Sequence, residues 1–274
     1  MSRYLFLIIL LVTLSCSPLK MYQELPEVKA WENEIAKFEY LDKTEQYSSD
    51  AIIFAGSSSI RLWTDLAEDM EPFEIIQRGY GGARLSDFAV YADRIFSPHP
   101  CSAVVLFIAN DITGDEKDKS PEEVKRLFLN VLKTIRRSHP HVPVFWIGIT
   151  PTSSRWNAWP EISKANDLIS EACQNRNNTY FIRTDYAFLN GNGKPRDELF
   201  VADKLHLNRE GYKLWAQIIK QEIEKVMEKA KSPGPEVYSW PVDDQDEAKR
   251  LIAPDVKGIA TYLSGWLNEQ VGLH

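Results

Sequence analysis

Two short segments far apart in the chain carry residue types that can activate a nucleophile. Residues 56–60 read GSSSI and follow an apolar run, so we expect Ser58 where a buried strand ends and a helix begins. Residues 203–206 read DKLH, which places a carboxylate three residues before a histidine. A serine hydroxyl becomes a nucleophile when an imidazole takes its proton, and a carboxylate fixes the tautomer of that imidazole. Ser58, His206 and Asp203 therefore form a candidate set for acyl transfer through a covalent intermediate.

Apolar runs that alternate with helix-like stretches predict the elements that position these residues. Strands are expected at 51–55, 74–77, 103–108, 142–147 and 179–182. Helices are expected at 25–41, 61–66, 85–96, 121–138, 161–175 and 208–230. Short, continuously apolar strands between helices indicate an α/β fold whose parallel sheet is covered on both faces. Ligands of such sheets bind beyond the carboxyl ends of the strands.

Glycine and amide residues follow the predicted second and third strands. Gly82 ends the segment 78–82 (RGYGG), and Asn110 lies in the segment 107–111 (FIAND). Acyl transfer to Ser58 develops an oxyanion, which needs hydrogen-bond donors such as the N–H of Gly82 and the side-chain amide of Asn110. Each segment alone is as typical of a turn or a helix cap. Their joint position at predicted strand ends favours an active site.

The four segments, in this order, resemble the motif blocks of the SGNH or GDSL hydrolase family of esterases and lipases. The resemblance covers residues 24–230. It implies a flavodoxin-like three-layer α/β/α sandwich with a five-stranded parallel sheet, no metal and no cofactor. The residues that stand in the family's catalytic positions are Ser58, Asp203 and His206, with Gly82 and Asn110 in its oxyanion hole.

Two positions depart from the family's blocks. Ser57 stands where the first block usually has Asp, and Ile108 stands where the third block usually has Gly. Because Ile108 alters the loop that carries Asn110, one alternative to a hydrolase is a catalytically weak carbohydrate-binding module on the same fold. An O-acyltransferase is another alternative, since an acyl-enzyme can pass its acyl group to a sugar instead of water.

The first 16 residues predict export. Arg3 precedes an apolar run that is too short to span a bilayer as a helix. The small residue Ser15 before Cys16 resembles a bacterial lipoprotein cleavage box, so we expect acylation at Cys16 and a location in the periplasm or at the cell surface. An ordinary secretory signal peptide is the alternative. At the other end, residues 231–274 are predicted to form a helical extension.

Composition limits the partners of the chain. The 274 residues carry a net charge of −7, which disfavours nucleic acid and anionic membrane surfaces as partners. A metal site built from Asp111, Asp203 and His206 is disfavoured, because the five histidines include no pair at the spacing of a helical zinc site. Cys101 and Cys173 could pair in an exported protein, but we favour two separate buried thiols.

Aromatic and arginine side chains near the strand ends are the candidates for substrate binding. They are Arg61, Trp63, Tyr80, Arg84, Trp156 and Trp159. Aromatic rings of this kind stack on sugars or line acyl pockets, and they also pack in cores. Together with the export signal, they favour a small acyl ester as substrate, with an acetylated carbohydrate as the specific hypothesis.

Overall fold

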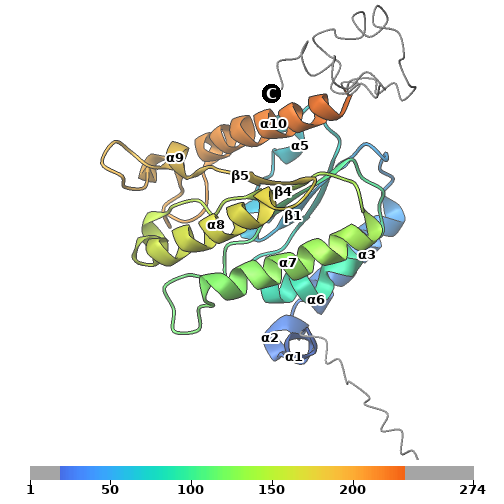
Figure 1. Cartoon of the computed structure of the whole chain (residues 1–274), viewed down its shortest axis with the longest axis horizontal. Helices are drawn as coiled ribbons and strands as arrows, with labels where there is room; N and C mark the ends of the chain where they lie inside the picture. Colours follow the sequence, from blue (N-terminus) through green and yellow to red (C-terminus); the bar gives the residue numbers. More distant parts are fainter. Residues whose placement is uncertain (1–18, 232–274) are drawn as a thin grey trace, which may run out of the picture. The chain divides into compact units, whose positions relative to one another are not determined.

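The computed structural model describes residues 19–231 of the chain (Figure 1). One compact unit of the chain ends at Ile223. The predicted signal segment 1–16, with its acylation site Cys16, lies outside the described residues. So does the predicted extension beyond residue 231.

Five parallel strands form one sheet in the order β2-β1-β3-β4-β5. The strands are β1 (Ile52–Gly56), β2 (Ile75–Gly79), β3 (Ala103–Phe107), β4 (Val144–Ile147) and β5 (Thr179–Ile182). Every residue of β1, β3 and β4 is buried, which explains why these strands read as continuous apolar runs. The prediction of an α/β fold with a five-stranded parallel sheet is confirmed.

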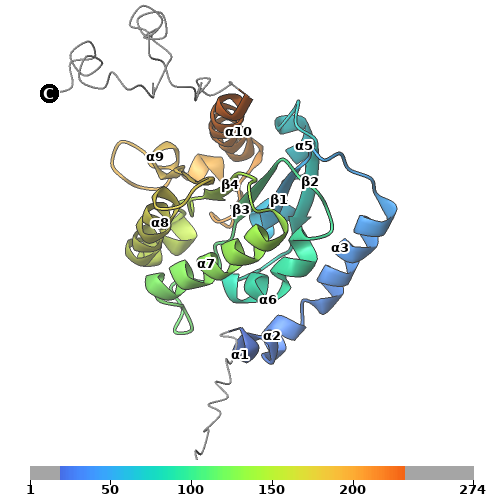
Figure 2. The ribbon, with the colours of Figure 1, turned by 45° about the vertical axis from the view of Figure 1, so that its right-hand side comes forward.

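Helices cover both faces of this sheet (Figures 1 and 2). They are α1 (Lys20–Gln23), α2 (Pro26–Lys29), α3 (Glu32–Thr44), α4 (Ser58–Arg61), α5 (Leu66–Asp69), α6 (Leu85–Phe96), α7 (Pro121–Ser138), α8 (Trp159–Gln174), α9 (Asp185–Phe188) and α10 (Arg209–Lys231), with 3-10 turns η1 (Ser153–Ala158) and η2 (Asp197–Leu199). Helices α6, α7 and α8 pack side by side on one face, and α10 lies on the opposite face with α5. Right-handed crossovers between parallel strands produce this separation.

Two predicted helices are divided in the structure. The predicted helix 25–41 forms α2 and α3, and the junction residue Trp31 packs its ring 5.0 Å from that of Tyr80. The predicted helix 61–66 is replaced by α4 and α5. Between them the chain turns so that Trp63 enters the core, where its ring stacks on Tyr212 at 5.3 Å. A tryptophan thus lies at each break, and of the two only Trp63 is a core residue, at 1% exposed.

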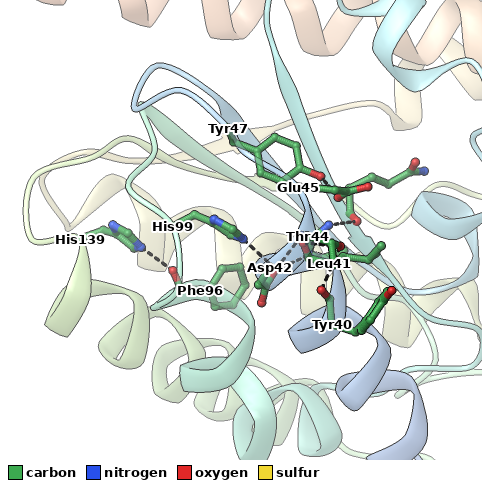
Figure 3. Close-up of polar contacts among 11 residues, drawn as sticks. Tyr40, Leu41, Asp42, Thr44, Glu45, Tyr47, Phe96, His99 and His139 are labelled. Carbon is green, nitrogen blue, oxygen red and sulfur yellow. Dashed lines mark hydrogen bonds and ion pairs between the residues drawn. The ribbon is translucent and has the colours of Figure 1, made fainter.

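A buried ionic cluster fixes α3 to the sheet. Oδ1 of Asp42 accepts hydrogen bonds from Nη2 of Arg78 at 2.7 Å and from Nε at 3.2 Å. The same oxygen lies 2.7 Å from Nε2 of His99 (Figure 3). Arg78 belongs to β2 and is only 1% exposed. Its guanidinium also lies 5.7 Å from the ring centres of Phe38 and Tyr47. The cluster therefore joins α3, β2 and the segment after α6.

The substitution Asp42→Asn tests this anchor. It leaves the guanidinium of Arg78 buried without its counter-charge, which should lower the free energy of unfolding by about 3–5 kcal/mol. Urea unfolding followed by tryptophan fluorescence measures the loss. The matched control is Glu34→Gln, because Glu34 pairs with Lys37 in the exposed part of α3. Equal losses in the two variants would contradict the assigned role of Asp42.

Candidate active site

Ser58, His206 and Asp203 meet at the carboxyl end of the sheet. Ser58 is the first residue of α4, directly beyond β1, and its Oγ lies 2.9 Å from Nε2 of His206. Nδ1 of His206 lies 2.7 Å from Oδ2 of Asp203. Because a carboxylate only accepts hydrogen bonds, Nδ1 carries the proton and Nε2 accepts from the serine hydroxyl. The imidazole is thus in the tautomer that can remove the proton of Ser58.

In the turn that carries Asp203 and His206, the carboxylate of Asp203 binds backbone N–H groups of the same turn. Oδ1 of Asp203 accepts hydrogen bonds from the N–H groups of Leu205 at 2.9 Å and His206 at 3.0 Å. Between them, Lys204 adopts a left-handed backbone with φ of 53°. Burial alone would raise the pKa of Asp203, but these hydrogen bonds and that of the imidazole outweigh it and lower the pKa to about 2.

Close approach of two strands fixes the backbone before Ser58. A side chain at Gly56 would collide with the carbonyl oxygen of Phe107, so only glycine fits this end of β1. The same carbonyl accepts a hydrogen bond of 2.9 Å from the N–H of Ser57. On the other side, the hydroxyl of Tyr212 in α10 donates to the carbonyl oxygen of Ser59 at 2.9 Å. Ser58 is therefore held between β3 and α10.

Asn110 lies beyond β3 with both ends of its amide engaged. Its Nδ2 donates to the carbonyl oxygen of Ala83 at 2.9 Å. Its Oδ1 accepts a hydrogen bond of 2.7 Å from Nη2 of Arg155, a residue of η1 that is not among the predicted site residues.

A pocket of about 460 Å³, its open mouth included, lies beside Ser58. Its polar lining includes Ser58, His206, Asn110 and Arg155. Its apolar lining is drawn from β3, the segment after β4, the segment around η2 and α10: Phe107, Ile149, Phe200, Leu207 and Trp215. A hydroxyl with an adjacent base at a pocket that combines apolar and polar lining is an arrangement suited to acyl transfer.

The sequence of residues 44–214 matches the model of the GDSL-like lipase/acylhydrolase family. The chain belongs to this family. It is therefore an esterase by class, as the sequence analysis predicted. No curated protein matches the chain.

Solved structures share the fold of this acylhydrolase at low sequence identity. A GDSL-like lipase from Bacteroides thetaiotaomicron superposes with a TM-score of 0.59 at 17% identity, over 70% of this chain and 98% of that one. A carbohydrate esterase family 3 protein from Talaromyces cellulolyticus superposes with a TM-score of 0.52 at 15% identity, over 66% of this chain and 99% of that one. An acetyl xylan esterase superposes with a TM-score of 0.53 at 20% identity, over 63% of this chain and 99% of that one.

Two of the predicted substrate-binding residues are core residues of the acylhydrolase. Trp63 is 1% exposed, and its Nε1 donates to Oδ2 of Asp69 at 2.7 Å. Tyr80 is fully buried, with its ring stacked on that of Phe88 at 5.0 Å. The prediction that Trp63 and Tyr80 contact substrate is therefore wrong, because packing against neighbouring helices removes both rings from the surface.

The other four candidates are accessible but do not line the pocket beside Ser58. The guanidinium of Arg61 lies against Gly81. Arg84 lines a second hollow, at the start of α6. Trp156 and Trp159 stack with ring centres 6.0 Å apart, and Nζ of Lys194 lies 4.9 Å from the Trp156 ring. These four residues can contact only the parts of a ligand that extend beyond the pocket.

Gly82 lies outside the pocket lining as well. It adopts a left-handed backbone with φ of 75° and sits beneath the ring of Trp31. With Trp31, Arg84 and Lys117 it lines a second hollow at the start of α6. Sequence reasoning missed Trp31, because its position at a break between α2 and α3 was not expected.

Two buried carboxylates hold the start of α6 next to the loop of Asn110. Oδ2 of Asp111 accepts a hydrogen bond of 2.8 Å from the N–H of Leu85, and its Oδ1 lies 3.2 Å from Nζ of Lys119. Oδ2 of Asp87 accepts from the N–H of Arg84 at 2.9 Å. Burial raises the pKa of Asp111, and it raises that of Asp87 to about 6. The carboxylate of Asp111 therefore has a structural role, in which it holds the start of α6.

The described residues also bear on the predictions for the cysteines and for a metal site. Cys101 and Cys173 are separate buried thiols, as favoured, and burial raises their pKa values to about 11 and about 12. Within residues 19–231, no three His, Cys, Asp or Glu side chains lie close enough together to hold a metal ion. No helix in the same range has the length and apolarity needed to cross a membrane.

The low pKa of Asp203 predicts how pH affects its contribution to stability. A depressed folded-state pKa stabilises the protein above the ordinary value of 3.8, and this stabilisation is lost as pH falls to about 2. Asp203→Asn should therefore unfold at a lower temperature than the wild type at about pH 6, with a smaller difference at about pH 2.5. Scanning calorimetry measures both. A difference that stayed constant or grew on acidification would refute the assigned hydrogen bonds.

Proposed function

We propose that this acylhydrolase is an exported serine esterase that removes a small acyl group from a carbohydrate, with acetyl as the group we expect. The observation that carries the proposal is the continuous series of hydrogen bonds that joins Ser58, His206 and Asp203, of which Ser58 and His206 line a pocket. This series also favours an enzyme over the carbohydrate-binding module considered above.

In the proposed mechanism, Nε2 of His206 takes the proton of Ser58 while Oγ attacks the ester carbonyl carbon. The charge that develops on the imidazole is stabilised by the carboxylate of Asp203. His206 then returns the proton to the leaving alcohol, which departs and leaves an acyl-Ser58 ester. Water, deprotonated by His206, attacks this ester and releases the acid. The last step regenerates the hydroxyl of Ser58.

Donors for the developing oxyanion are available near Ser58. Nδ2 of Asn110 carries two hydrogens, and one of them is used by the carbonyl oxygen of Ala83. We assign the second hydrogen, together with the backbone N–H of Ser58, to the oxyanion. Gly82 remains a proposed donor on the basis of the family resemblance, although it lines the hollow at the start of α6. Loss of one such donor costs roughly 2.7–4 kcal/mol in a transition state.

The size and lining of the pocket support a small acyl group. Its volume of about 460 Å³ includes the open mouth. The volume that the centre of a water-sized sphere can reach is only about 30 Å³, so the enclosed part of the pocket is small. Phe107, Ile149 and Trp215, which are almost fully buried, close the pocket with apolar surface. An acetyl group fits this lining, and a long acyl chain would have to extend into solvent.

Two observations support a carbohydrate as the alcohol part of the substrate. The stacked rings of Trp156 and Trp159 adjoin Arg155, which lines the pocket, so they can form a platform for a sugar outside it. The fold is also shared with a carbohydrate esterase and an acetyl xylan esterase. The proposal extends the substrate class of those proteins to this chain.

Export and acylation at Cys16 are part of the proposal on the ground of sequence alone. Residues 1–16 combine Arg3, an apolar run and the dipeptide Ser15–Cys16. Metabolic labelling with a radioactive fatty acid tests the anchor in a bacterial host. Equal incorporation into wild type and Cys16→Ser would rule it out.

A chain-length series tests the substrate assignment. With p-nitrophenyl esters, we expect kcat/KM to fall at least about tenfold from acetate to octanoate, because the enclosed part of the pocket is small. Acetate release from acetylated xylo-oligosaccharides should accompany this preference, and Ser58→Ala should lower both activities by about 10³-fold or more. A preference for octanoate would contradict the small-acyl proposal. Acetylation of an added acceptor sugar at the expense of hydrolysis would instead identify the O-acyltransferase.

A further inference from the structure

We propose that Arg155 is a positioning residue for the oxyanion site, which acts by holding the side-chain amide of Asn110 in one orientation. This inference rests on the proposed function, because it concerns the group that we assign to the oxyanion. Nothing in the family resemblance or in the sequence motifs places a role on Arg155.

The planar guanidinium of Arg155 forms hydrogen bonds with two consecutive residues of the loop after β3. Nη1 donates to the carbonyl oxygen of Ala109 at 2.6 Å, and Nη2 donates to Oδ1 of Asn110 at 2.7 Å. A fork of this kind fixes both distance and plane, which a single ammonium cannot do. Arg155 therefore sets the loop backbone and the Asn110 side chain at once.

The two hydrogen bonds of Arg155 also determine which end of the Asn110 side-chain amide faces the developing oxyanion. An asparagine amide has a donor end and an acceptor end, and rotation by half a turn exchanges them. The acceptor end, Oδ1, would repel a developing oxyanion. Arginine has only donors, so Arg155 can pair with Oδ1 and not with Nδ2. The bond of Nδ2 to Ala83 selects the same orientation from the opposite side.

The charge of Arg155 adds to this geometric effect. Its hydrogen-bond acceptors in the described residues are the uncharged oxygens of Ala109 and Asn110. The positive charge polarises the amide through Oδ1, which makes the N–H groups of Asn110 stronger donors. Because Arg155 lines the same pocket as Ser58, this polarisation operates where the oxyanion would form.

The turn η1 supports Arg155 from both sides. The N–H of Ser154 donates to the carbonyl oxygen of Lys204 at 3.3 Å, which joins η1 to the turn of Asp203 and His206. On the other side, the ring of Trp156 stacks on Trp159 at the start of α8. Arg155 thus connects the base and the proposed oxyanion donor through one short segment.

A double-mutant cycle tests the proposal. Arg155→Met keeps the length of the side chain and removes the fork, so kcat for an acetyl ester should fall about 10- to 100-fold while KM changes less than about threefold. Arg155→Lys keeps the charge and should lie between Arg155→Met and the wild type. In an Asn110→Ala background, Arg155→Met should cost less than about twofold, because its target is absent. Arg137→Met, in the exposed part of α7, is the matched control.

Three outcomes of this cycle would overturn the proposal. Equal losses in the two backgrounds would mean that Arg155 acts independently of Asn110. A rise in KM at constant kcat would assign Arg155 to substrate binding. An unchanged kcat in Arg155→Met would leave Arg155 with no role in the reaction.

A second readout does not depend on turnover or on the fold of one variant. The side-chain amide signals of Asn110 in a ¹H–¹⁵N spectrum are identified by their loss in Asn110→Ala. We expect them to shift or broaden in both Arg155→Lys and Arg155→Met, and to stay unchanged in Arg137→Met. Unchanged signals in Arg155→Lys would overturn the proposal. If the wild type hydrolysed no ester, the proposed function would be wrong. Asn110 signals that still changed in the Arg155 variants would then show that Arg155 positions Asn110 all the same.

Discussion

The hydrogen bond between Oγ of Ser58 and Nε2 of His206 is the interaction on which the rest of the site depends. It joins residues that are 148 positions apart, so it forms only when the first strand and the last loop meet at one edge of the sheet. A parallel sheet brings all carboxyl ends of its strands to that edge. The close approach of β1 and β3 at Gly56 then leaves the serine little freedom to move.

The two halves of the site are held by different means. The base side uses a short turn, in which Asp203 binds two backbone N–H groups and the imidazole of His206. The proposed oxyanion side uses longer connections, through Arg155 and the carbonyl oxygen of Ala83. The turn η1 reaches both halves, so a change in η1 affects the nucleophile's base and the amide of Asn110 together.

The sequence predicted the sheet, most helices and the residues that meet at the strand ends, because these depend on local periodicity and on strand order. It did not predict burial of Trp63 and Tyr80. Aromatic residues near a strand end can face either the core or the solvent, and only packing against α10 and α6 decides. The contact of Arg155 with Asn110 spans 45 positions and leaves no local signature.

Reaction with a fluorophosphonate, followed by peptide mapping by mass spectrometry, tests the central claim most directly. This reagent modifies a serine hydroxyl that a base has activated. The structure predicts a single label on Ser58, much slower labelling in His206→Ala, and normal labelling in Ser59→Ala. A label on Ser57 or Ser59, labelling that persists in Ser58→Ala, or no label on the wild type would contradict the assignment of Ser58 as the nucleophile.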